Sequence, residues 1–78
     1  MRKKTNDSLK LRCREIGERV LKIRRRLGMR QKDLALLSGV HYLTIGYIEV
    51  GKVIPSLASL LLICDTLKVP VSKLLEEI

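Results

Sequence analysis

The sequence predicts an all-α domain of five helices, on three observations. Apolar residues recur at intervals of three and four near the start of the chain, which is the spacing of one helix face. No stretch alternates polar and apolar β-branched residues as a half-buried strand would. Breaks fall near Gly28, Gly39, Gly51, Pro55 and Pro70, and they leave segments of helical length between them.

The first helix is predicted behind a capping cluster at residues 6–8 and ends at Gly28. Its inward stripe is Leu9, Cys13, Ile16, Val20, Ile23 and Leu27. Gly17 lies inside the helix and costs about 1 kcal/mol relative to Ala. We therefore expect a regular helix only from about Glu15. Residues 1–14 would form a basic N-terminal arm or helix extension, and residues 15–78 the folded domain.

Four shorter helices are predicted to follow, at residues 31–37, 42–50, 57–67 and 71–77. The side chains expected to point inward are Leu34, Ala35 and, as a further candidate, Leu37; Ile45 and Ile48; and Leu57, Leu60, Ile63, Cys64 and Leu67. Ser56 is expected to cap the fourth helix. The chain has no Phe or Trp, so its core must be aliphatic.

The charge and hydrophobicity of the chain limit the classes of partner that it can have. Thirteen of the 16 Lys and Arg residues fall in residues 1–32, which hold three acids, and the whole chain carries a net charge of +8. Such polarity indicates a polyanionic partner, either a nucleic acid or an anionic membrane. The longest apolar run, Leu60 to Cys64, is far shorter than the roughly 20 residues of a membrane span. Polar residues 5–8 replace the apolar core of a signal peptide, so we expect a cytoplasmic protein.

Catalysis, metals and cofactors are not expected. The sequence has one histidine, His41, and two cysteines, Cys13 and Cys64, which form no metal-binding spacing. No nucleophile–histidine–acid set and no phosphate-binding glycine loop is present. We interpret both cysteines as reduced thiols, with Cys64 on the buried side of its helix.

Residues 31–50 follow the pattern of a helix, a glycine turn and a second helix. Ala35 is the fifth residue of this unit, where a small side chain allows close helix packing, and Gly39 is the ninth, at the turn. Val40, Ile45 and Ile48 are expected to point to the core.

The chain resembles the phage-repressor/Cro-type helix-turn-helix proteins, the Xre family, over about residues 15–76. The resemblance lies in Ile16-Gly17-Glu18-Arg19-Val20, Ile23-Arg24, Gly28-Met29, Gln31, Leu34-Ala35, Gly39-Val40, Ile45, Ile48-Glu49, Gly51-Lys52, Pro55-Ser56, Leu60, Ile63-Cys64, Leu67, Val69 and Leu74-Leu75. It implies a compact repressor-like domain that binds double-stranded DNA.

The resemblance also implies roles for individual residues. The residues expected to read bases in the major groove, from a recognition helix at about residues 42–50, are Tyr42, Leu43, Thr44 and Tyr47. Those expected to contact phosphate are Gln31, Lys52 and Arg30. Arg24 and Glu49 match a buried structural ion pair between the first and third helices.

The chain departs from the family at several positions. Arg30 and His41 stand where Ser or Thr usually caps a helix, and an arginine cannot accept a cap bond. Gly46 replaces a polar residue that contacts DNA. Tyr42 and Leu43 replace residues that are commonly polar, so readout would depend more on thymine methyl groups and on phosphate bonds from tyrosine hydroxyls.

A homodimer is expected, because relatives often pair through their C-terminal helices and because Leu62 lies about 150° from the inward face of its helix. The predicted interface residues are Leu61, Leu62, Val71, Leu74 and Ile78.

These observations favour a sequence-specific transcriptional regulator, with a repressor as the model, that reads an inverted-repeat operator. The alternatives are the antitoxin of a toxin–antitoxin pair, with a toxin as its protein partner, and a restriction–modification controller. A membrane-surface role for the basic first helix is an alternative from a different class.

Overall fold

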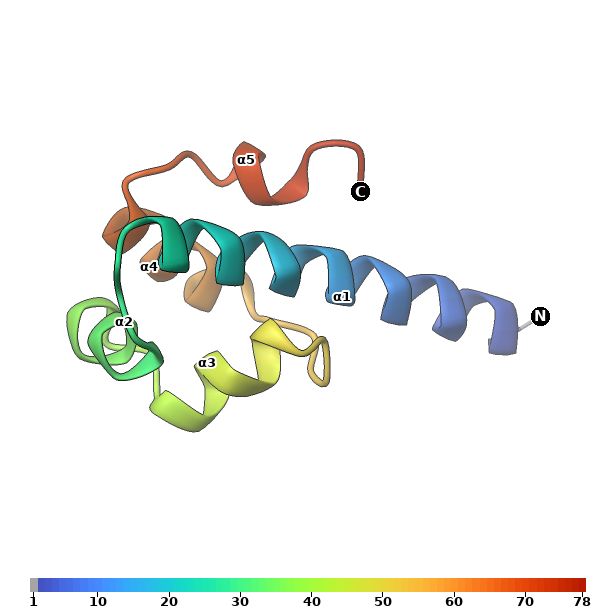
Figure 1. The fold of residues 1–78 in the computed structure, drawn as a ribbon. Helices are drawn as coiled ribbons and strands as arrows, with labels where there is room; N and C mark the ends of the chain where they lie inside the picture. The colour runs from blue at the N-terminus through green and yellow to red at the C-terminus, as the bar shows by residue number, and fades with distance from the viewer. Residues whose placement is uncertain (1) are drawn as a thin grey trace.

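The computed structural model describes residues 2–78, with side chains from Asp7 onward, and it contains five helices in that part of the chain. The helices are α1 (Arg2–Arg26), α2 (Gln31–Ser38), α3 (Tyr42–Glu49), α4 (Leu57–Leu67) and α5 (Ser72–Leu75) (Figure 1). The predicted all-α, five-helix architecture is confirmed, although the last helix is shorter than residues 71–77.

The long helix α1 organises the fold. It packs against α3 on one side and against α5 on another, while α2 contacts both α3 and α4. In Figure 1 the N-terminal turns of α1 project beyond the other helices, and α5 and α3 lie on opposite sides of α1. The arrangement leaves one long face of α3 uncovered.

The core is aliphatic, as the absence of Phe and Trp requires. Its fully buried side chains are Val20, Leu34, Ile45, Ile48, Ile63, Leu67 and Leu74. They come from all five helices, so every helix is fixed to the same core. None of the helices that the structure describes is long and apolar enough to cross a membrane.

The start of α1 differs from the prediction. The helix begins at Arg2, ahead of the expected cap at residues 6–8, and it runs without a break through Gly17. Arg and Lys at residues 2–4 are good helix formers, so the chain enters the helix before it reaches the polar cluster. Residues 2–14 are thus a helix extension in backbone terms, while the side chains of residues 1–6 lie outside the described residues.

Gly17 marks a close helix–helix contact. A Cβ atom at this position would lie 2.8 Å from the Glu49 carbonyl oxygen, and it would overlap the Ile48 carbonyl oxygen as well. The C-terminal end of α3 therefore lies directly against the backbone of α1. The glycine that costs helix propensity is what allows α3 to pack at this distance.

Four leucines that were expected to point inward are exposed: Leu9, Leu27, Leu37 and Leu57. Leu9 lies in the N-terminal part of α1 that projects beyond the other helices, and the other three lie at helix ends. Leu27 follows the last residue of α1, and Leu57 is the first residue of α4, so neighbouring elements do not cover them. In the last turn of α2 the buried residue is Ser38 instead of Leu37.

Two helix starts are stabilised locally. The Ser56 hydroxyl accepts the Ser59 N–H at 3.0 Å, which confirms the predicted cap of α4. At α2 the side chain of Arg30 accepts nothing, but the Asp33 carboxylate accepts the Arg30 N–H at 2.9 Å. The hydrogen bond from the Arg30 guanidinium, followed by this backbone bond, lowers the pKa of Asp33. Half of a capping box therefore replaces the missing serine or threonine.

The two glycines inside helices allow a matched test of close packing. We expect Gly17→Ala to lower the free energy of unfolding by about 1–3 kcal/mol, because its methyl group would overlap the α3 backbone. Gly46→Ala should instead raise stability by up to about 1 kcal/mol, since the nearest atom to its Cβ is 3.9 Å away. Urea unfolding measures both. Equal changes in the two variants would contradict the close contact.

Candidate nucleic-acid interface

The turn between α2 and α3 sets the angle of the helix pair. Gly39 has a φ of +78°, the positive value that its position in the turn predicted. The Ser38 hydroxyl accepts the Val40 N–H at 3.1 Å, and the Val40 side chain is buried. Because Val40 and the inward face of α3 are anchored in the core, the outer face of α3 has a fixed orientation.

His41 caps α3. Its Nδ1 atom accepts the Leu43 N–H at 3.1 Å, the kind of bond that a serine or threonine hydroxyl accepts when it caps a helix. The imidazole therefore takes over the function of the residue it replaces. The sequence indicated that His41 replaces the usual serine or threonine, but it did not indicate that the imidazole itself caps the helix.

The outer face of α3 forms an open hollow with the start of α2. Its lining residues, which we call the recognition surface, are Gln31, Tyr42, Leu43, Gly46, Tyr47 and Val50. Both tyrosines and Leu43 are exposed, while Ile45 and Ile48 of the same helix are buried. Three of the four predicted base-reading residues thus lie together. The fourth, Thr44, is half-buried and does not line this hollow.

A buried ion pair connects the recognition surface to the first helix. Arg24 Nε donates to one Glu49 carboxylate oxygen at 2.6 Å, and a terminal nitrogen of Arg24 donates to the other at 3.0 Å. Both side chains are buried, as predicted. The bond to Glu49, offset in part by burial, raises the pKa of Arg24. The other terminal nitrogen of Arg24 donates to the Met29 carbonyl at 2.7 Å, which connects the turn between α1 and α2 to the ion pair.

Gln31 belongs to the same network. Its Nε2 atom donates to Glu49 Oε1 at 2.9 Å. The amide group therefore has a defined position at the edge of the recognition surface, next to Gly46. A Gln31 side chain fixed by Glu49 is preorganised for a contact outside the protein.

Cations lie at both ends of the recognition surface. Lys52, after α3, has its Nζ atom 5.6 Å from the centre of the Tyr47 ring. Arg30 and Lys32, at the start of α2, share a second hollow with Gln31 and Tyr42. The surface is therefore nearly neutral in its centre and basic at its ends.

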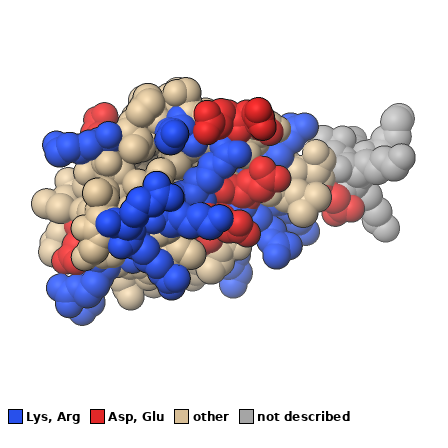
Figure 2. Space-filling view, turned by 45° about the horizontal axis from the view of Figure 1, so that its top comes forward, with Lys and Arg blue, Asp and Glu red and all other residues tan. Residues whose placement is uncertain are grey.

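The remaining positive charge is spread more widely. In Figure 2, which brings the α5 side of the molecule forward, Lys and Arg side chains cover much of the face, with Asp and Glu side chains among them. Charge on this face can attract a polyanion over a distance, but its mixed signs do not mark a single site.

Neither cysteine suggests chemistry. Cys13 and Cys64 are free and buried. Burial, together with the nearby Asp65 charge, raises the pKa of the Cys64 thiol and keeps it protonated. No group of three or more metal-binding side chains occurs among the described residues.

The predicted dimer residues divide into two sets. Leu61 and Leu62 are exposed on α4. Leu74, by contrast, has no exposed surface, so its inclusion in a subunit interface was wrong; it is a core residue. Val71 and Ile78 are half-buried and pack against the same core. The spacing of apolar residues in α5 was correct, but it could not distinguish a core face from an interface.

Sequence reasoning also missed two members of the site. Lys32 lines hollows on either side of Tyr42, and Val50 is exposed at the end of the recognition surface. Both follow from helical spacing. Lys32 is in the exposed first turn of α2, and Val50 is one residue past the end of α3.

Comparison with known proteins agrees with this geometry. The helix-turn-helix family HTH_3 matches residues 20–74. Among solved structures, the restriction–modification controller protein C.AhdI from Aeromonas hydrophila superposes with a TM-score of 0.77 and 29% sequence identity, over 80% of this chain and 94% of that one. A search of curated proteins found no match.

The ion pair predicts a large effect from a small substitution. Glu49→Gln leaves the Arg24 guanidinium buried without a counter-charge, and we expect it to lower the free energy of unfolding by about 3–5 kcal/mol. Glu18→Gln is the matched control, since Glu18 is exposed and forms no ion pair within the described chain, and it should change stability by less than about 0.5 kcal/mol. Thermal and urea unfolding measure both. A loss at Glu49 no larger than at Glu18 would contradict the structural role of the pair.

Proposed function

The chain belongs to the helix-turn-helix family, a family of DNA-binding regulators, and from this premise we propose that it is a sequence-specific transcriptional regulator. In this proposal α3 enters the major groove of double-stranded DNA and reads base edges. The observation that carries the proposal is the recognition surface itself, an exposed helix face whose position is fixed by the His41 cap and the Glu49 network.

The composition of this surface supports a particular kind of readout. Tyr42, Leu43 and Tyr47 offer aromatic and aliphatic surface and two hydroxyl groups, with no charged side chain among them. Apolar side chains recognise the thymine methyl group, and hydroxyl groups bond to phosphate or to base edges. Lys52, Arg30 and Gln31 would contact phosphates on either side of the groove.

A homodimer would double this reading unit. Leu61 and Leu62 are exposed on α4, away from the residues that line the recognition surface. A two-fold axis through α4 would present two copies of α3 to one face of DNA. Recognition helices of such dimers lie about 34 Å apart and read the two halves of an inverted repeat.

A restriction–modification controller is the second candidate. It is favoured by the similarity to C.AhdI, which extends over 94% of that protein's chain. A controller would bind DNA in the same way as any other regulator of this family, so the neighbouring genes distinguish the two functions. Restriction and methyltransferase genes beside the gene for this chain would support it, and a toxin-like reading frame there would favour the antitoxin alternative.

The test of DNA reading separates affinity from specificity. In-vitro selection from random duplexes should return an enriched inverted repeat. Lys52→Ala should then weaken binding to every sequence and reduce the slope of log K against log salt by about 1 per protomer. Tyr47→Ala should change which sequences are preferred, because it removes a base-facing side chain.

Two results would contradict DNA reading. One is a selection that enriches no sequence. The other is a Tyr47→Ala variant that loses the same factor of affinity on the selected site as on random DNA, which would assign Tyr47 to non-specific binding only.

The dimer prediction has its own matched control. We expect light scattering to show a dimer for the unmodified protein and a monomer for Leu61→Glu/Leu62→Glu. Leu36→Glu/Leu37→Glu alters two adjacent exposed leucines of α2 in the same way, and it should remain dimeric. If the unmodified protein stays monomeric at high micromolar concentration, pairing through α4 is wrong.

A further inference from the structure

We propose that Lys10 and Arg14, on the N-terminal extension of α1, form with Lys52 a second phosphate-binding surface, which we call the basic flank. It would hold the DNA backbone beside the recognition surface. The proposal rests on the proposed function, since it names a further contact to the same DNA. Both α1 residues precede the family match, which begins at residue 20.

The three cations lie around one hollow. Its lining residues are Asp7, Lys10, Leu11, Arg14, Gly51 and Lys52. Two of the cations come from α1 and one from the loop after α3, so segments far apart in sequence bring like charges together. Asp7 is the single acid in the hollow and leaves it positive. The ion pairs of the described chain are Arg24–Glu49 and Arg30–Asp33, so none of the three cations is neutralised by one.

The backbone brings the segments that carry Arg14 and Lys52 close to one another. Gly51 has a φ of +73°, and a Cβ atom on it would lie 2.8 Å from the Arg14 Cα. The loop therefore passes directly over α1 one turn before the Gly17 contact. Arg14 and Lys52 are therefore carried on segments whose backbones touch, and an anion bound in the hollow would be attracted by both charges.

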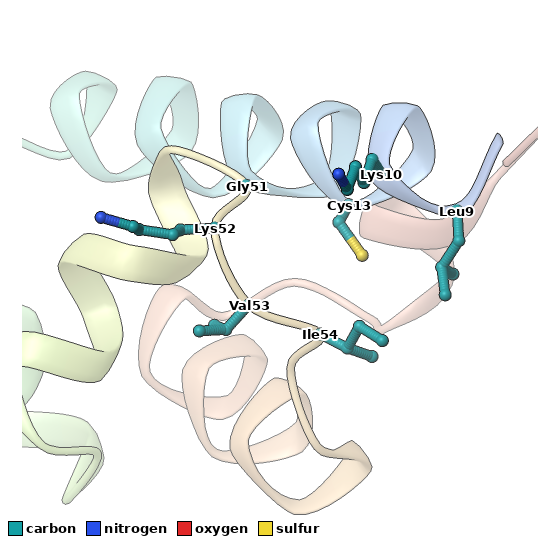
Figure 3. Close-up of a pocket in the computed structure, with 7 residues that line it drawn as sticks. All are labelled: Leu9, Lys10, Cys13, Gly51, Lys52, Val53 and Ile54. Carbon is teal, nitrogen blue, oxygen red and sulfur yellow. The ribbon is translucent and has the colours of Figure 1, made fainter. Parts of the chain in front are cut away.

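Packing fixes this part of α1. Leu9 and Cys13 point from the helix toward Ile54 of the loop (Figure 3). With Val53 they line a hollow of about 290 Å³ to which Lys10 and Lys52 also belong, and the Lys52 side chain extends from it toward α3 (Figure 3). Cys13 is buried and Leu9 lies exposed at the edge of this hollow, so packing supports α1 at Cys13, and Lys10 and Arg14 lie within one helical turn of it.

The helix geometry aims the two residues toward α3. At about 100° per residue, Lys10 and Arg14 lie about 20° and 60° around α1 from Gly17, which touches α3. Lys52 joins the basic flank to the recognition surface, because its Nζ atom lies over the Tyr47 ring. The two surfaces are thus continuous, which favours duplex DNA over a separate anionic partner.

The same geometry supplies a charge-matched control. Arg12 and Lys22 are exposed residues of α1 that lie about 140° from Gly17, one on each side. Lys10→Gln/Arg14→Gln and Arg12→Gln/Lys22→Gln each remove one lysine and one arginine. Glutamine has nearly the helix propensity of both, so both variants should unfold at about the temperature of the unmodified protein.

The experiment measures affinity against salt concentration for two duplexes of equal length, one with the selected site and one of random sequence. The loss of two phosphate contacts should reduce the slope of log K against log salt by about 2 per protomer for Lys10→Gln/Arg14→Gln on both duplexes. The order of preferred sequences should not change. The control variant should keep the slope of the unmodified protein.

Three outcomes would overturn the basic flank while leaving the proposed function intact. The first is an equal loss of slope in both double variants, which assigns the effect to net charge. The second is an unchanged slope in Lys10→Gln/Arg14→Gln while Tyr47→Ala still alters site preference. The third is unchanged DNA binding together with lost sedimentation on anionic lipid vesicles. Failure of the proposed function itself would show differently, as an unmodified protein that selects no sequence.

Discussion

The buried pair between Arg24 and Glu49 is the interaction on which the rest of the structure depends. It joins the last turn of α1 to the last turn of α3, and through Gln31 and the Met29 carbonyl it also holds the start of α2. Two charges without access to water are tolerated only when their hydrogen bonds are satisfied, and no buried side-chain polar atom in the described chain lacks a partner. Three helices are therefore fixed at one point, directly behind the recognition surface.

The charged and uncharged parts of the molecule's surface lie in different places. The centre of the recognition surface is neutral and rich in tyrosine, while cations lie at its ends and along α1. Phosphate contacts are insensitive to sequence and provide affinity, whereas contacts to base edges discriminate between sites. Under the proposed function, the excess of positive charge in the composition would therefore set how strongly and how fast the protein binds DNA. The choice of site would depend on a few uncharged side chains of α3.

Much of the fold could be predicted from the sequence because helical spacing records which residues are buried. The inward residues of α3, those of α4 apart from Leu57, and the aliphatic core follow from that spacing, and the Arg24–Glu49 pair follows from the family resemblance. Helical spacing failed to predict which element packs against a given helix face, because tertiary packing determines that. Leu74 has the pattern of an amphipathic face, but only the fold shows that α5 turns that face to the core and away from a partner. Gly17 resembled a weak point in a helix, although its effect is to admit the α3 backbone.

The His41 cap of α3 also determines a polar group beside the recognition surface. Since Nδ1 of His41 accepts the Leu43 N–H, a neutral imidazole must carry its hydrogen on Nε2. A serine hydroxyl in that place could rotate to suit any neighbour. The ring instead presents a donor of fixed tautomer, beside Tyr42 and Lys32 in the same hollow. A rigid imidazole in place of a freely rotating hydroxyl thus gives the start of α3 a polar N–H with a fixed direction. The same residue also caps the helix.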